Sequence, residues 1–343
     1  MLTDRQLLIL QVIIDDFIES AHPVGSRAIS KKDEISYSAA TIRNVMADLE
    51  EMGYIEKTHS SSGRIPSEKG YRYYVDHVIA PSVDKTNLNI IKGMLQGEFI
   101  DFEKLVQKSA EVLSDLTNYT SIILGPEIFE TRVKQMQIVP LSENTAVAIL
   151  ITDSGHVEHH SFSIPNEISA SDLEKMVNIL NERLKGVSLA KLPELLNTEV
   201  VSLMKKYVQD FEKSYHYLKS AFSEQPVKLY IGGRTNLLTQ PEFNDINKIR
   251  SFYRMMENED EVVNLLKVPQ QGIRVTIGRE NELEAIQDFS LITASYQLRD
   301  EQMGTIALIG PTRMEYRKVI TLLNALSNEM TDVLYLWYKN NSK

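Results

Sequence analysis

The chain has 343 residues, of which 43% are hydrophobic and 24% charged, and it contains no cysteine. This length favours two or three domains, and the lack of cysteine excludes disulfides, zinc fingers and iron–sulfur clusters. The sequence shows neither a basic leader nor about 20 consecutive apolar residues, so we expect a cytoplasmic protein with no membrane contact. The formal net charge of −10 has the wrong sign for coating DNA, so DNA binding would need a local patch.

The first 80 residues show the order helix, helix, helix, hairpin, helix. Apolar residues recur at spacings of three and four, Pro23 and Gly25 interrupt the first pattern, and a Ser/Gly-rich tip separates two short strands. The predicted helices cover residues 3–20, 27–32 and 67–80 and a third stretch that starts at Ser36 or Ser38 and ends at Met52. The strands cover 54–59 and 64–66. This order is typical of a winged helix-turn-helix.

The third helix of this segment carries a candidate DNA-reading face. Its apolar residues are Ile42, Val45, Met46 and Leu49. A rotation of about 100° per residue then turns Ala40, Asn44 and Ala47 outward, flanked by Thr41 and Arg43. Arginine suits guanine and asparagine suits adenine, although an ordinary amphipathic helix could carry the same two residues. A basic cluster around the hairpin tip favours the DNA-binding interpretation.

The candidate DNA-binding residues come from this helix and from the hairpin with the start of its following helix. They are Ser38, Ala40, Thr41, Arg43, Asn44, Lys57, His59, Arg64, Lys69 and Arg72. We expect Ser38 and the helix N-terminus to hold a phosphate.

The rest of the chain alternates strands and helices without a regular strand–helix–strand repeat. The predicted strands cover residues 120–124, 133–141, 145–152, 156–164, 227–231, 273–277, 289–298 and 305–309. The pattern favours an α+β domain built on an antiparallel sheet.

A heptad-like seam in this part is a candidate dimer contact. Its apolar residues alternate spacings of four and three and are Met204, Val208, Phe211, Tyr215, Leu218 and Phe222. The same seam also fits a core helix that packs within one chain.

Five motifs together resemble the HrcA family, the heat-inducible transcription repressors of bacterial chaperone operons. They are PVGSR at 23–27, ATIRNVMADLE at 40–50, SSGRIPSEKGYR at 61–72, QPEF at 240–243 and IGPTRM at 309–314. The joined motifs are far more specific than a short helix-turn-helix match, and the resemblance runs along the whole chain.

The resemblance implies an α+β multidomain protein with a winged helix-turn-helix, a GAF-like α+β domain and an inserted α/β dimerisation subdomain. We expect the first at 1–80, a linker at 81–95, the GAF-like domain at 96–190 and 280–343, and the insertion at 191–279. The implied function is negative regulation of heat-shock chaperone operons. A homodimer would bind an inverted-repeat operator, supported by the chaperonin GroEL and released on heat stress, with no cofactor.

Two other function classes fit the sequence less well. An enzyme is not expected, since no Gly-x-Ser-x-Gly elbow occurs and residues 231–235 lack the Lys-Ser/Thr ending of a phosphate loop. His156 and His160 would lie on one side of a strand and His159 on the other, which favours surface histidines over a metal site. A winged-helix regulator controlled by a small molecule in the GAF-like domain is the remaining alternative, but no convergent polar residues identify a ligand.

Overall fold

A computed structural model of the chain shows a mixed α+β protein with helices and three sheets, in agreement with the predicted class. The described residues are 2–58, 63–79, 85–95, 102–125, 132–142, 144–153, 157–163, 170–187, 192–196, 198, 229–243, 245–266, 272–298 and 301–341. They form two compact units: unit 1 comprises Met1–Gly125, Leu229–Gln297 and Gly304–Met330, and unit 2 comprises Pro126–Lys228, Leu298–Met303 and Thr331–Lys343.

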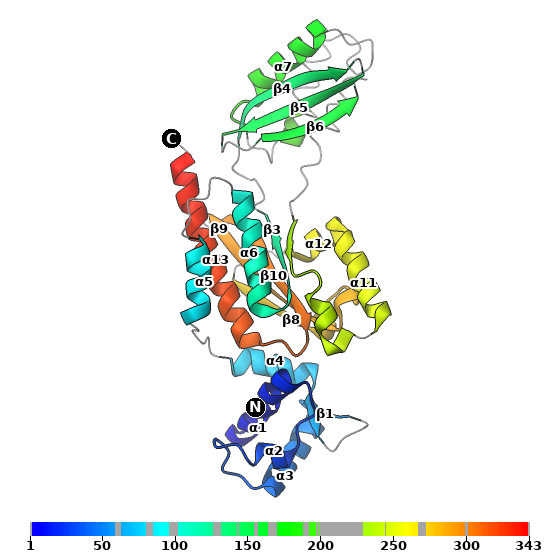
Figure 1. Ribbon diagram of the computed structural model, residues 1–343, viewed down its shortest axis with the longest axis vertical. Coiled ribbons are helices and arrows are strands. Elements are labelled where there is room, and N and C mark those ends of the chain that lie inside the picture. Colours follow the sequence, from blue (N-terminus) through cyan, green and yellow to red (C-terminus); the bar gives the residue numbers. More distant parts are fainter. Residues whose placement is uncertain are drawn as a thin grey trace. The chain divides into compact units, whose positions relative to one another are not determined.

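The chain begins in unit 1 with three helices, a hairpin and a fourth helix, the order that the sequence predicts (Figure 1). These elements are α1 (Asp4–Ser20), α2 (Ser26–Ile29), α3 (Ala39–Glu51), β1 (Ile55–Lys57), β2 (Arg64–Pro66) and α4 (Glu68–His77). Thr3 starts α1 with a capping box, because its hydroxyl accepts the Gln6 N–H and the Gln6 side chain accepts the Thr3 N–H. Ala21 ends the helix in the left-handed region at φ 55°.

A five-stranded sheet forms the centre of the rest of unit 1. Its strands, in spatial order, are β7 (Leu229–Gly232), β3 (Thr120–Leu124), β10 (Glu301–Pro311), β9 (Phe289–Leu298) and β8 (Ile273–Ile277). The pairs β3–β7, β3–β10 and β8–β9 are antiparallel, and Leu124 lies opposite both Leu229 and Thr305. We call this part of unit 1 the sheet domain.

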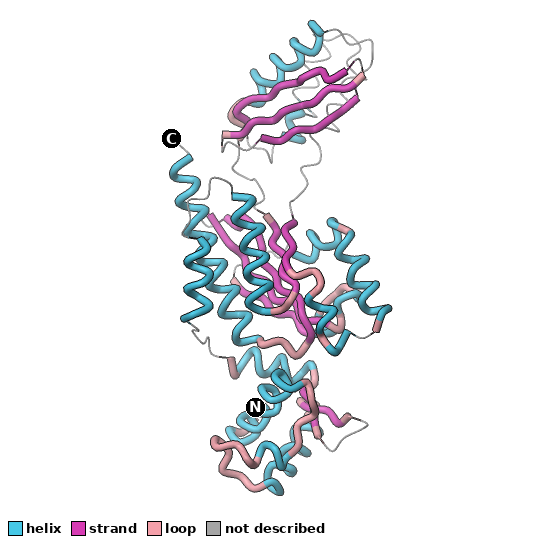
Figure 2. Tube along the Cα trace, in the orientation of Figure 1, coloured by secondary structure: helices cyan, strands magenta, loops and turns pink. Residues whose placement is uncertain are grey.

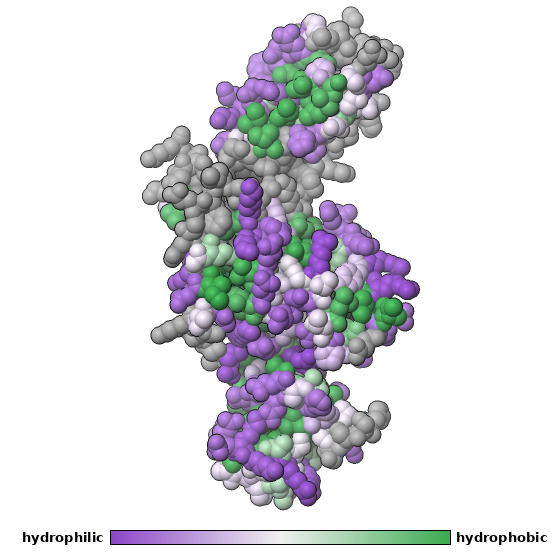
Figure 3. Space-filling model, viewed as in Figure 1, coloured by the Kyte–Doolittle hydropathy of each residue, from purple (hydrophilic) through white to green (hydrophobic). Residues whose placement is uncertain are grey.

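Helices cover the sheet domain (Figure 2). Helix α6 (Phe102–Thr117) contacts β3 and β7, α5 (Lys85–Leu95) contacts α6, and Lys92 of α5 pairs with Glu329 of α13 (Tyr316–Asn341). The outer face of α6 is hydrophilic (Figure 3), whereas Leu105, Val106 and Leu113 are buried. This pattern is that of an amphipathic helix that covers a sheet.

Two further helices, α11 (Ile246–Glu257) and α12 (Glu259–Leu266), lie between β7 and β8 in the sequence. The Phe252 ring of α11 stacks on Phe289 of β9 with centroids 5.0 Å apart. Both rings are almost fully buried, so this contact anchors α11 on the sheet domain.

Unit 2 contains a smaller, separate sheet. Its strands β4 (Val133–Ser142), β5 (Thr145–Thr152) and β6 (Val157–Ser163) pair antiparallel in the order β4-β5-β6. The buried face of β5 packs with α7 (Ala170–Leu184) and α8 (Leu192–Leu195) in one apolar core. Burial alternates along β5 with a period of two, as expected for a strand with one covered face.

The observed division of the chain differs from the predicted boundaries. The prediction placed residues 96–190 and 280–343 in a GAF-like domain and 191–279 in an insertion. In the structure β4, β5 and β6 form their own sheet, while β7 and β8 belong to the five-stranded one. The predicted linker at 81–95 also contains α5. Strand periodicity identifies each strand but carries no information on its distant partner, so it could not show which strands share a sheet.

The close approach of α6 and β7 gives a test of the packing. A Cβ atom on Gly232 would lie 2.3 Å from the Ala110 carbonyl oxygen and 2.7 Å from the Ser121 hydroxyl. We therefore expect Gly232→Ala to lower the free energy of unfolding by about 1 to 3 kcal/mol, the range for overpacking, in a urea titration. The matched control is Gly93→Ala in α5, where nothing lies within 4 Å and a gain of about 0.5 to 1 kcal/mol is expected. Equal stability of the two variants would contradict this packing.

Candidate nucleic-acid interface

Helix α3 presents the candidate reading residues, and Ser38 defines where it begins. The Ser38 hydroxyl accepts a hydrogen bond from the Thr41 N–H at 3.2 Å and lies 3.0 Å from the Thr41 hydroxyl. This cap fixes the first turn. The N-terminus of such a helix carries partial positive charge, which suits a phosphate group.

One face of α3 is buried and the other is open to solvent. The buried residues are Ile42, Val45, Met46 and Leu49, as the sequence predicts. The exposed residues include Ala40, Arg43, Asn44 and Ala47, while Thr41 is half-buried. Since α3 contacts both α1 and α2, the exposed face is held rigidly by the packing beneath it. It combines two side chains that can bond base edges with two small residues that permit close approach.

Two acidic residues of α1 bond to other side chains within residues 1–80. Asp16 pairs with Lys32 after α2, and this hydrogen bond is the main reason that the pKa of Lys32 is raised. Asp15 accepts a hydrogen bond at 2.6 Å from the Tyr74 hydroxyl of α4, and burial together with this bond raises the pKa of Tyr74. Both contacts fix α1 against its neighbours, and the Lys32 ammonium also compensates the negative charge of Asp16, which would repel a nucleic acid.

The hairpin of β1 and β2 lies directly after α3. Its strands are antiparallel with Lys57 opposite Arg64. Val24 adds a third short strand, because its N–H and carbonyl exchange hydrogen bonds with Arg64 at 2.8 and 2.9 Å. Lys57 is exposed, whereas His59 and the tip at 59–62 lie outside the described residues.

Two of the predicted basic residues bond to the C-terminal end of α3, Arg64 from the hairpin and Lys69 from the start of α4. Arg64 donates from Nε at 2.8 Å and from Nη2 at 2.7 Å to Glu50 Oε2. Lys69 donates to the Met52 carbonyl at 2.7 Å and lies 4.6 Å from the centre of the Tyr54 ring. No short-range pattern in the sequence pairs Arg64 with Glu50, which lies 14 positions earlier, so this ion pair was not predicted.

Arg72 lies in a different place from the predicted DNA-binding surface. Its Nε donates to Glu280 Oε1 at 2.8 Å, its Nη2 to the Val275 carbonyl at 2.7 Å and its Nη1 to Asp76 at 3.1 Å. The hydrogen bond to Glu280 is the main cause of its raised pKa. Burial alone would raise the pKa of Glu280, but the hydrogen bonds from Arg72 and the Ile277 N–H hold it below its usual value. Arg72 thus binds the sheet domain, which corrects the prediction.

Arg5 is a cation near the N-terminus of α3 that the sequence analysis did not single out. Its guanidinium carbon lies 5.9 Å from the centre of the Tyr37 ring, and Tyr37 directly precedes the Ser38 cap. Arg5 is exposed. The sequence shows an arginine in the first turn of the first helix, but Arg5 and Ser38 are far apart in the sequence. Their closeness in space could therefore not be predicted.

The remaining predictions concern unit 2 and other kinds of site. All six seam residues from Met204 to Phe222 lie outside the described residues, as does His156. His159 and His160 are successive residues of β6 and so point to opposite faces. Within the described part of the chain, no three acidic or histidine side chains gather as a metal site would require, and no helix is long and apolar enough to cross a membrane.

Comparison with known proteins identifies the family. The family model described as "HrcA protein C terminal domain" matches residues 103–320. The heat-inducible transcription repressor HrcA of Oceanobacillus iheyensis is 63% identical over 343 residues, which is 100% of both chains. The chain belongs to the HrcA family. As an HrcA-family member it is a heat-inducible transcription repressor, and a repressor acts through DNA.

One solved structure shares the fold of this chain. The crystal structure of a hypothetical protein, 23% identical, superposes with a TM-score of 0.65 over 98% of this chain and 100% of that one. This likeness concerns the fold alone. The crystal structure of the Thermotoga maritima IclR is 12% identical and covers 97% of this chain and 100% of that one. Its TM-score is 0.23, so the two folds are not alike enough to compare.

The pair of Arg64 and Glu50 predicts how the hairpin is held on α3. We expect Glu50→Gln to speed hydrogen exchange at the Val24 and Arg64 amides by up to about fivefold, the effect of losing about 1 kcal/mol from a partly exposed ion pair. Glu51→Gln is the control, since it removes the same charge from an exposed position one residue on. If both variants exchange at the same rate, the ion pair does not hold the hairpin.

Proposed function

We propose that residues 1–80 are a winged helix-turn-helix that places α3 in the major groove and the β1–β2 hairpin along the DNA backbone. The observation that carries this proposal is the solvent-exposed pair of Arg43 and Asn44 on a helix whose opposite face is buried. A recognition helix needs this division, because its outer face reads base edges while its inner face packs on the domain.

We infer further that the repressor binds an inverted-repeat operator as a homodimer. Residues 1–80 carry nine Lys or Arg against twelve Asp or Glu, so one copy would bind DNA weakly. Two copies on one face of the duplex add their contacts and match the symmetry of an inverted repeat. In this proposal the sheet domain is GAF-like, and the seam from Met204 to Phe222 remains the candidate dimer contact.

The proposed targets are heat-shock chaperone operons, and the proposed partner that supports the active repressor is the chaperonin GroEL. Two routes for heat release follow: loss of a marginally stable fold, or limited supply of chaperonin. Refolding the purified chain with and without GroEL, then counting operator-competent dimers, separates them. The chaperonin route requires a higher yield with GroEL, whereas the direct route requires equal yields and reversible loss on warming.

Replacing the reading residues tests the proposed recognition helix. Arg43→Ala or Asn44→Ala should weaken specific binding by about 1 to 3 kcal/mol, the discrimination carried by one bidentate base contact. The measurement is a band shift on specific and scrambled duplexes. Arg250→Ala in α11 removes the same exposed charge from the sheet domain and should leave the affinity unchanged. If both α3 variants keep the affinity and the sequence preference of wild type, α3 does not lie in the major groove.

The hairpin proposal is tested through salt dependence. Lys57 is exposed, so Lys57→Ala should lower the slope of log affinity against log salt by about 1, the value for one phosphate contact. Arg64 is already bonded to Glu50, so Arg64→Ala should change the slope less than Lys57→Ala. The reverse order would show that Arg64 leaves Glu50 for a phosphate on binding.

A further inference from the structure

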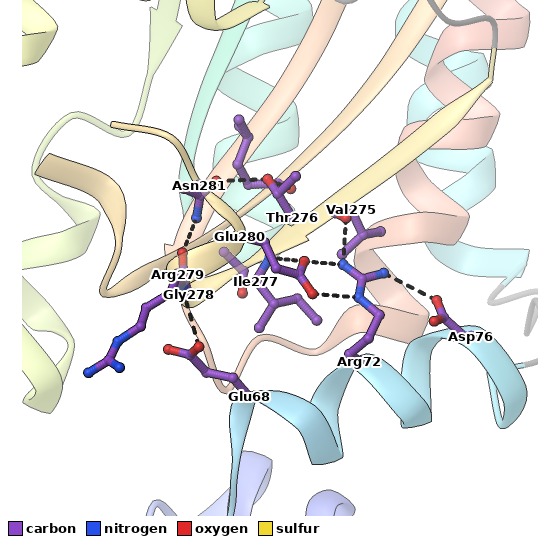
Figure 4. A network of polar contacts seen from close by, with 12 residues as sticks. Glu68, Arg72, Asp76, Val275, Thr276, Ile277, Gly278, Arg279, Glu280 and Asn281 are labelled. Atoms are coloured by element: carbon purple, nitrogen blue, oxygen red, sulfur yellow. Dashed lines mark hydrogen bonds and ion pairs between the residues drawn. The ribbon is translucent and has the colours of Figure 1, made fainter. Parts of the chain in front are cut away.

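Helix α4 ends the DNA-binding segment and presents one polar face to the sheet domain. Glu68, Arg72 and Asp76 follow at intervals of four residues, so they lie along the same side of the helix (Figure 4). This side faces β8 and the short 3-10 helix η5 (Gly278–Glu280) that follows it. We call these contacts the α4 junction.

Arg72 makes the central contact of the α4 junction. Its guanidinium bonds both carboxylate oxygens of Glu280 and also the Val275 carbonyl. Asp76 holds the guanidinium from its own helix, and the Ile277 N–H holds the Glu280 carboxylate at 2.8 Å. A planar fork bonded to two oxygens tolerates little rotation, so this pair fixes direction as well as distance.

The loop that receives α4 is itself rigid. Asn281, which is 4% exposed, donates its side-chain amide to the carbonyls of Gly278, Ile286 and Phe289 at 2.8, 3.1 and 2.9 Å. Gly278 has φ +56°, and a Cβ atom there would lie 2.3 Å from a carboxylate oxygen of Glu68. Glu68 also accepts the Arg279 N–H at 3.3 Å. Helix α4 therefore contacts a loop whose backbone conformation is fixed by the hydrogen bonds of Asn281.

A second attachment lies on the other side of the segment. Arg313 donates to the Ile18 carbonyl in α1 at 3.1 Å and is held by Gln240 at 3.1 Å and by Glu242. Two attachments on different helices restrict rotation far more than one does. The DNA-binding segment is thus coupled to the sheet domain through both α4 and α1.

We propose that Arg72 and Glu280 are positioning residues that fix the orientation of the recognition helix, so that the repressor selects the spacing between operator half-sites. This inference rests on the proposed dimeric binding of an inverted repeat. Two rigidly held recognition helices reach half-sites at one separation only, whereas loosely held ones adapt to several. Neither residue needs to touch DNA for this effect, because it acts through the angle of the segment.

The test varies both partners of the α4 junction, and the two Glu280 variants leave the DNA-binding segment unchanged. Purified full-length wild type, Glu280→Ala, Glu280→Gln and Arg72→Ala are each titrated with one half-site and with inverted repeats of increasing spacer length. Wild type should prefer one spacer. The three variants should bind the single half-site with an affinity within about twofold of wild type. Their preference for one spacer should fall about tenfold, because a loosely held segment lowers the effective concentration of the second recognition helix at its half-site. Glu282→Ala, which removes a nearby exposed charge, is the matched control.

The outcomes separate this inference from the proposed function. If wild type prefers one spacer and Glu280→Ala keeps that preference, the positioning role fails while dimeric operator binding stands. If half-site affinity falls together with spacer preference in all three variants, the junction supports the fold of the segment and the positioning role also fails. If wild type binds no inverted repeat better than a half-site, dimeric operator binding fails and this inference fails with it.

Discussion

The burial of one face of α3 is the constraint on which the DNA-reading surface depends. Ile42 and Leu49 are fully buried, so the helix can present only its opposite face to a ligand. That packing reaches α1, α1 is held to α4 by Tyr74 and Asp15, and α4 is held to the sheet domain by Arg72. Arg43 and Asn44 have no part in this series of contacts, so the reading residues can change without disturbing the fold.

Local patterns were sufficient where a segment's structure depends on its own residues. The three- and four-residue spacing in α3 predicted its buried face because one turn of helix sets which residues share a side. The apolar run that ends at the predicted turn after Thr152 predicted β5 with the bounds that the structure shows, Thr145–Thr152. The cap at Ser38 was also predictable, since serine before an apolar repeat favours a helix start.

Long-range partners could not be predicted in the same way. Glu280 lies 208 positions from Arg72, and no spacing rule joins two residues so far apart. The sequence groups Arg72 with the basic residues around the hairpin, such as Arg64 and Lys69, so its charge alone suggested DNA. The grouping of strands into sheets could not be predicted for the same reason, because β7 pairs with β3, which lies far away in the sequence.

The pairing of Leu124 with Leu229 has a topological consequence. Residues 126–228 leave the sheet domain at the end of one strand and return at the start of its neighbour, so for the five-stranded sheet they are equivalent to the loop of a β-hairpin. The entropy of closing a flexible loop rises by only about 0.6 kcal/mol for each doubling of its length. A short turn could therefore replace this whole stretch without breaking any strand pair of the five-stranded sheet.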